Sequence, residues 1–582
     1  MADTGISAIS SLYYQPSITF SGLSSGIDSQ SIIEKLVEVE SRQMERLEAW
    51  KQEWEEKITA LQTLNTKMTD FRTTAAAYNT PAKFQARTAA SSSTSVLTAT
   101  AASTATTGTH QVLVNQLAQN DVYAHAGLSS SDTVINSSGS TKVFAFKYPD
   151  SSATPVSIVV ANNATLADLA TAINTSGANP GVTATVLDMG PSYTSDRYRL
   201  VLQGNNTGAD YNIVFDAATD ALTTLDGTGG TVDFRSSTFT QAQEAQNAQL
   251  RVDGYPASGW LERSTNTVSD VISGVTLSLL STSASAVQVT ISDDTTAMYD
   301  KIKNVVEKYN DVIAYIKEQT KYDAITGEAG ILFGNYAMQI VKSGLNAIAT
   351  GNGQGFQDPD DPYINLPQIG ITTDNDESSE TFGQLLIDET TLTTALSANP
   401  QGVANLMAAY YRGLSDDATG NISYYSSIPG ITKPGIYTVE ATVSGGVITS
   451  GTINGHTATI SGDTLTGMSG YDECGLAVRV NLVDGAYTGT VRLELGKNGE
   501  FSSKLDDLLS TTSGPVNILI NNYQDIVDNI EEKIALEQRR LEGYQQRLLE
   551  QFTRLEAVLA QLNDQANYIA SQMQQMGMSS KS

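Results

Sequence analysis

The feature that most constrains this chain is a row of apolar residues near its C-terminus that repeats every seven positions. The row holds over eight positions: Ile520, Val527, Ile534, Leu541, Leu548, Leu555, Leu562 and Ile569. A companion row follows it, first three residues on and then four: Tyr523, Ile530, Tyr544, Phe552, Leu559, Ala566 and Met573. Sustained seven-residue spacing is typical of coiled-coil helices. We therefore expect one long helix with an apolar stripe over about 516–575.

A shorter row of the same period lies near the N-terminus: Leu47, Trp54, Leu61, Met68 and Ala75. Asp28 stands where an N-cap side chain would accept the free amide hydrogens of the first helical turn, and Pro81 ends the pattern. Neither helix can bury its stripe alone. Two arrangements stay open: an ordinary antiparallel pair of the two helices, or packing of each against neighbouring subunits.

The middle of the chain is rich in Thr, Ser, Gly and Asn and alternates apolar with polar residues. This alternation predicts half-buried strands; the clearest lie at 112–116, 143–147, 156–160, 183–187, 198–202 and 275–279. Helical spacing returns at 165–174, where Thr165 is the expected cap, and at 296–321. The middle of the chain is therefore predicted to form small β-rich lobes with occasional helices.

The predicted fold class is α+β, with a helical coiled-coil stalk built from both ends of the chain and several β-rich lobes inserted between them. The expected divisions are a flexible segment and helix start at 1–45, an N-terminal stalk helix at 46–85, two β-rich lobes at 86–294 with the inner one at about 130–240, a return to the helical domain at 295–416, an inserted lobe at 417–505, and a stalk helix with a flexible tail at 506–582.

Composition excludes several classes of partner. The 582 residues include 34 Lys plus Arg against 63 Asp plus Glu, a formal net charge of −29. Binding to nucleic acid or to anionic membranes needs the opposite sign. Cys474 is the only cysteine, so no internal disulfide can form. Residues 1–20 lack the basic start and apolar run of a cleavable signal, and no later stretch reaches the length of a membrane span.

The sequence contains no residue pattern that indicates a catalytic residue, a cofactor site or a metal site. We therefore expect a protein that is not an enzyme. His110, His125 and His456 have no acidic or cysteine partner at metal-ligand spacing. Asp358, Asp360 and Asp361 could gather a cation, but the adjacent prolines favour a solvated turn.

Two stretches carry a family resemblance. The first is Gly22-Leu23-Ser24-Ser25-Gly26-Ile27-Asp28; the second starts at Arg263 and runs through Asn266, Thr267 and Gly274 to Leu279. Both resemble the flagellar filament cap family, FliD, also called hook-associated protein 2. The likeness continues in order along most of the chain and departs mainly between about 417 and 500.

The resemblance implies a function that spacing alone does not. Members of this family leave the cell through the flagellar type III export channel and form a ring, a pentamer in the best-known members, at the distal filament tip. The implied partners are other copies of the chain, flagellin, the hook–filament junction proteins and an export chaperone at the C-terminal helix. The rows of packing residues would then serve the stalk and the oligomer. The alternatives are a hook–filament junction protein and a surface adhesin that binds host glycans.

Overall fold

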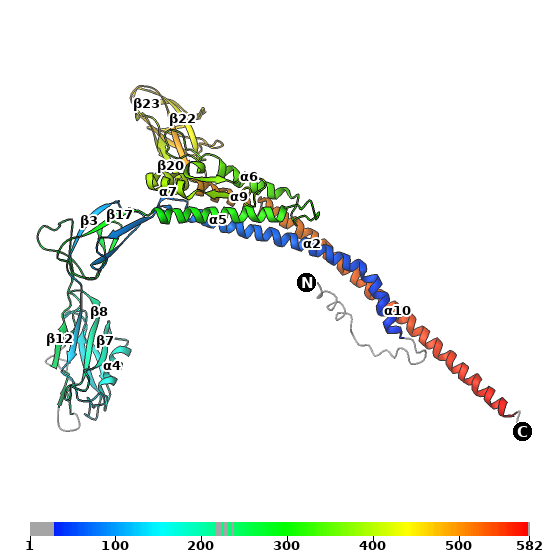
Figure 1. Ribbon diagram of the computed structural model, residues 1–582, viewed down its shortest axis with the longest axis horizontal. Helices are drawn as coiled ribbons and strands as arrows, with labels where there is room; N and C mark the ends of the chain where they lie inside the picture. Colours follow the sequence, from blue (N-terminus) through cyan, green and yellow to red (C-terminus); the bar gives the residue numbers. More distant parts are fainter. Residues whose placement is uncertain (1–27, 216–222, 226–230, 235–237, 580–582) are drawn as a thin grey trace.

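The computed structural model describes residues 28–215, 223–225, 231–234 and 238–579. The expected flexibility of the first 27 residues, and the motif residues Gly22, Leu23 and Gly26, lie outside the described part. The fold is α+β, as predicted: a long helical stalk and a helical body carry three β-rich lobes (Figure 1). Among the described residues, we find no helix that combines the length and the apolar character needed to cross a membrane.

The stalk consists of α2 (Ser29–Ala77) and α10 (Pro515–Ser579), which run antiparallel. Asp28 caps α2 as predicted, because its carboxylate accepts the amide hydrogen of Ser31 at 3.1 Å. The contact between Ser29 and Glu556 at one end and that between Asn65 and Asn517 at the other fix the antiparallel register.

The helical body packs against the inner end of the stalk. Its elements are α3 (Pro81–Phe84), α5 (Thr295–Thr320), α6 (Tyr336–Thr350), the 3-10 helix η2 (Leu366–Ile369), β18 (Ile371–Thr373), β19 (Leu385–Ile387), α7 (Glu389–Ala398), α8 (Pro400–Ala408) and α9 (Lys497–Leu509). Phe71 of α2 lies 6.0 Å from the ring of Tyr309 and 5.2 Å from that of Phe501. All three rings are buried, so stalk and body share one core.

The first lobe hangs from the body on β1 and β17. One sheet has the order β1-β17-β3-β13-β14 and the other β15-β16-β2, with antiparallel pairing throughout. The strands are β1 (Arg87–Ser91), β2 (Leu97–Ala101), β3 (Gly108–Gln116), β13 (Ala248–Val252), β14 (Leu261–Arg263), β15 (Thr267–Ile272), β16 (Val275–Leu279) and β17 (Val287–Asp293).

The inner lobe continues outward from the first lobe (Figure 1). Its sheets have the orders β12-β4-β8-β7, β6-β5-β9 and β10-β11, and the helix α4 packs among them. The elements are β4 (Asn120–His125), β5 (Lys142–Lys147), β6 (Val156–Val160), α4 (Leu166–Thr175), β7 (Val182–Asp188), β8 (Tyr198–Thr207), β9 (Val214–Phe215), β10 (Thr223–Leu225), β11 (Thr231–Asp233) and β12 (Phe239–Gln243). A capping box between Thr165 and Asp168 begins α4, so the predicted cap is confirmed.

The third lobe, which we call the inserted lobe, spans residues 410–495 and stands on the opposite side of the body (Figure 1). Its sheets have the orders β20-β28-β22-β23-β24 and β21-β27-β26-β25. The strands are β20 (Tyr410–Ser415), β21 (Ile422–Ser426), β22 (Gly435–Ser444), β23 (Val447–Ile453), β24 (His456–Thr457), β25 (Thr459–Ser461), β26 (Thr464–Thr466), β27 (Ala477–Val480) and β28 (Gly485–Leu495).

The six strands predicted from alternation are all present, within β3, β5, β6, β7, β8 and β16. The inserted lobe differs from the expected span of 417–505, because residues 497–509 form α9 and belong to the helical body. The first turn of α9 buries Lys497, Asn498 and Glu500, so the apolar helical pattern of Phe501, Leu505 and Leu508 starts only after that turn.

Candidate assembly site

The two predicted apolar rows form a seam between α2 and α10, and part of this seam is buried. Leu61, Met68, Leu541 and Leu548 are buried, whereas Leu47, Trp54, Ile534 and Phe552 are half-buried. The Trp54 ring meets the ring of Tyr523 edge-on, with centroids 4.8 Å apart. The apolar rows at the two ends of the chain therefore cover each other along the inner part of the stalk, as the antiparallel-pair interpretation expects.

The outer part of the same row is exposed. Leu555 is 47% exposed, Leu562 53%, Ile569 58% and Met573 65%. These four residues, which we call the uncovered stripe, lie level with or beyond the place where α2 begins, because Ser29 contacts Glu556 (Figure 1). Within the single chain, the sequence prediction that Leu555, Leu562 and Ile569 pack in a seam does not hold. Their packing in an oligomer stays a prediction.

The uncovered stripe is also nearly free of charge. Between residues 557 and 579 the sequence has one Asp, Glu, Lys or Arg residue, Asp564, in a chain with 17% charged residues. Groups of large exposed apolar side chains mark interaction sites in soluble proteins. Depletion of charge is typical of interface centres.

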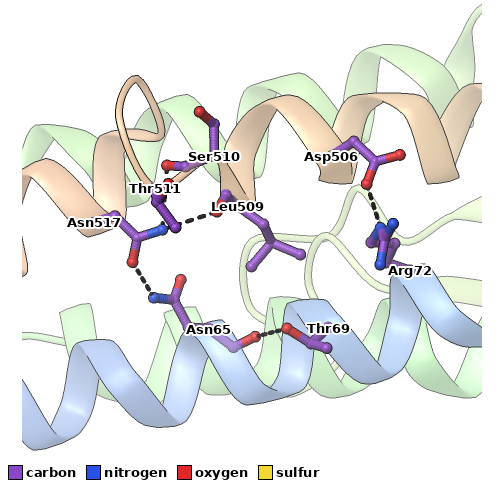
Figure 2. Close-up of a pocket in the computed structure, with 8 residues that line it drawn as sticks. All are labelled: Asn65, Thr69, Arg72, Asp506, Leu509, Ser510, Thr511 and Asn517. Atoms are coloured by element: carbon purple, nitrogen blue, oxygen red, sulfur yellow. Dashed lines mark hydrogen bonds and ion pairs between the residues drawn. The ribbon is translucent and has the colours of Figure 1, made fainter.

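Polar contacts hold the inner joint, which is the place where the chain passes from the end of α9 to the start of α10 beside α2 (Figure 2). The Asn65 amide donates to the Asn517 side chain at 2.7 Å, and Asn517 donates to the carbonyl of Leu509 at 2.9 Å. Arg72 pairs with Asp506 across the same groove. These contacts satisfy a carbonyl that the end of α9 leaves free and hold α10 in register with α2.

Ion pairs flank the seam farther out. Lys51 lies 2.6 Å from Glu531 of α10 and 3.4 Å from Glu55 of its own helix. The hydrogen bond to Glu531 is the main cause that raises the pKa of Lys51, although partial burial opposes it. Arg540 pairs with Glu40. Such solvent-accessible pairs contribute little to stability.

The internal motif that carried the resemblance organises the first lobe. Asn266 donates to the carbonyl of Ala118 and accepts from its amide, both at 2.8 Å. Gly274 has a φ of +74°, and a Cβ there would approach Ala105 to 3.0 Å, so this turn requires glycine. Arg263 bonds Asp270 at 2.9 Å, and this bond lowers the pKa of the Asp270 carboxyl. Thr267 begins β15. These residues therefore have structural roles.

The three histidines lie in separate places. His110 is 2.7 Å from Asp253, His456 is 2.6 Å from Glu473, and His125 is buried, which lowers its pKa. In the described ranges, no three His, Cys, Asp or Glu side chains gather in a way that could hold a metal ion.

One expectation about acidic residues was wrong. Asp361 was assigned to a solvated turn, but its side chain is 5% exposed and meets Arg492 and Arg412. Sequence reasoning missed this cluster because its other members come from strands about 50 and 130 residues farther along. Buried charges need partners, and these partners become visible only in the fold.

Comparison with known proteins agrees with the resemblance. The family model of the flagellar hook-associated protein 2 C-terminus matches residues 245–564, and that of its N-terminus matches residues 25–121. The flagellin hook IN motif matches residues 143–206, within the inner lobe.

Individual relatives extend over most of the chain. The B-type flagellar hook-associated protein 2 of Pseudomonas aeruginosa is 28% identical over 457 residues, which cover 73% of this chain and 88% of that protein. Flagellar hook-associated protein 2 of Escherichia coli K12 is 27% identical, covering 74% and 88%. The crystal structure of the D1-D2-D3 domains of the Escherichia coli flagellar cap protein FliD is 27% identical and covers 60% of this chain and 90% of that one, with a TM-score of 0.45.

The C-terminal family model alone spans more than half of the chain, and the N-terminal model of the same family precedes it in the expected order. The chain therefore belongs to the flagellar hook-associated protein 2 family.

Proposed function

We propose that this protein caps the distal end of the flagellar filament as a homo-oligomeric ring and promotes the folding and insertion of exported flagellin subunits. It is an extracellular structural protein of the flagellum and not an enzyme, as its family membership indicates. The proposal rests on that membership together with the uncovered stripe of α10, which offers an apolar, almost uncharged surface to a partner.

In this proposal the two ends of the chain have different partners from the lobes. The stalk enters the filament end and meets other copies of the chain, flagellin and the hook–filament junction proteins, while the lobes face outward. We expect a pentamer from the resemblance. An export chaperone would bind the C-terminal helix before assembly, because the uncovered stripe is the apolar surface that needs shielding.

The uncovered stripe permits a sharper test than the buried seam does. Leu548 is buried in the helix pair, so a charge there would damage the monomer itself. Leu562 and Ile569 are exposed, so Leu562→Asp with Ile569→Asp leaves the monomer's melting temperature unchanged. We expect this double variant to lose the concentration-dependent ring mass in light scattering and to leave cells without capped filaments.

The matched control is Gln561→Asp with Asn567→Asp, which adds the same two negative charges at exposed polar positions outside the stripe. It should assemble normally. Capped filaments of ordinary length on the double variant would refute the role of the stripe, and a ring that survives both substitutions would place the oligomer interface elsewhere.

A further inference from the structure

The inserted lobe joins the helical body through a buried cluster of charges. Four members come from the lobe: Arg412 on β20, Asp416 just after it, and Arg492 and Glu494 on β28. The fifth, Asp361, comes from the loop of the body that precedes η2. We call these five side chains the ionic junction.

Some contacts of the ionic junction lie within the lobe, and others cross from the lobe to the body. Glu494 accepts from Arg412 at 2.7 Å and from Arg492 at 3.0 Å. Arg492 also donates to Asp361 and, at 2.8 Å, to Asp416. Its Nη1 is 3.4 Å from the carbonyl of Gly355 in the body. Asp361 is thus the one carboxylate by which the body holds both arginines of the lobe.

The centre of the junction is buried and its charges are unequal, while Arg412 (33% exposed) and Asp416 (22% exposed) lie at its edge. The Glu494 side chain is 0% exposed and that of Arg492 is 4% exposed. Three carboxylates face two guanidinium groups, so one negative charge has no cation to balance it when all three are ionised. Burying an uncompensated charge is costly, and a proton removes that cost.

We propose that the ionic junction is a proton-sensitive latch: a proton on Glu494 tightens the inserted lobe onto the helical body, and loss of that proton loosens it. With Glu494 neutral, Asp361 and Asp416 balance Arg412 and Arg492. With Glu494 ionised, the four members from the lobe sum to zero charge, so Asp361 of the body faces no net positive charge and the junction as a whole carries one excess negative charge.

The direction of the effect follows from where the proton binds more strongly. Burial raises the pKa of Glu494 from 4.5 to about 7, although Arg412 acts against it. A carboxyl whose pKa is raised in the docked state takes up a proton on docking between those two values. Docking therefore strengthens as pH falls from about 7 towards 4.5.

A second charged pair lies where the inserted lobe meets the helical body, next in the chain to the ionic junction. Lys497 and Glu500 of α9 are 3.3 Å apart, and Glu500 accepts the amide hydrogen of Gln354 in the body loop. Burial raises the pKa of Glu500 and lowers that of Lys497. This pair is balanced, so its titration is separable from that of Glu494 by substitution.

Hydrogen exchange on the full chain tests the latch. The amide of Leu495 donates to the carbonyl of Gln354 at 3.1 Å, and its protection reports docking of the lobe. The amide of Val439, inside the sheet of the lobe, reports the lobe's own folding. After correction for intrinsic exchange, we expect the protection of Leu495 to be about 10-fold or more higher at pH 5 than at pH 8, while that of Val439 changes little.

Variants assign the response to one carboxyl. Glu494→Gln keeps a partner for both arginines and should hold high protection at both pH values. Asp361→Asn should lower the protection of Leu495 at both. Glu500→Gln and Glu440→Gln, the latter at an exposed carboxylate on β22, should keep the native pH response. Equal protection of Leu495 in the unsubstituted chain at pH 5 and pH 8 would overturn the latch without any variant, and so would a native response in Glu494→Gln.

Discussion

The two halves of α10 have the same sequence period and opposite surroundings. Up to Leu548, the residues of the heptad row face α2 and the body and are buried or half-buried. From Leu555 onward the same row faces outward, because α2 begins at Ser29, level with Glu556. The difference shows that a heptad row specifies an apolar face of a helix without specifying what covers that face.

The largest expected effect contrasts one residue from each half. Leu541 is 1% exposed and Leu562 is 53% exposed. Leu541→Ala should lower the free energy of unfolding by about 2–5 kcal/mol because it leaves a cavity in the seam. Leu562→Ala should change it by less than about 0.5 kcal/mol. Urea denaturation of the monomer measures both. Similar losses for the two variants would mean that the halves of α10 do not differ within the chain.

A smaller effect is expected at the joint in Figure 2. Asn517 donates to the carbonyls of Leu509 and Ser510 and accepts from Asn65. Asn517→Ala should lower the free energy of unfolding by about 1 kcal/mol, since it leaves partly buried polar groups without this partner. Asn521→Ala, at an exposed position one turn farther on, is the matched control and should be neutral. Urea denaturation measures the unfolding free energy of both variants. Equal losses for the two would mean that the hydrogen bonds of Asn517 at this joint do not stabilise the stalk.

The smallest effect concerns the exposed ion pair between Arg540 and Glu40. Their side chains are 46% and 43% exposed. Arg540→Gln should cost about 0.2–1 kcal/mol at low ionic strength, and salt should screen the difference. Arg539→Gln is the control, because Arg539 bonds the carbonyl of Ala535 in its own helix. A large loss that persists in high salt would indicate that the covered half depends on this pair more than on apolar packing.

The sequence predicted regular elements where local pattern and burial agree. The cap at Asp28, the strands β6 and β16 and the helix α4 are examples, because their buried residues recur with the period of the element. It did not predict α9, whose buried face carries Lys497 and Glu500. Those polar residues are tolerated there because each finds a partner on the body.

The candidate site was predicted in the same partial way. The row through Leu541 and Leu562 was read correctly as an apolar stripe, and the choice between a helix pair and subunit contacts was left open. In the fold the helix pair covers only the inner part of that stripe, since α2 is shorter than α10, and subunit contacts of the outer part stay a prediction. How much of one helix another helix covers depends on the register between them, and that register is set only when the chain folds.

By itself, the sequence determined the α+β class, the two terminal helices, the strand-rich middle and the family, because period and motif are local properties of a chain. Only the tertiary structure decided which apolar residues are covered, that residues 410–495 form the inserted lobe, and that Asp361 meets Arg412 and Arg492. The physical reason is that burial and charge balance depend on neighbours brought together by folding, and no local pattern in the sequence records those neighbours.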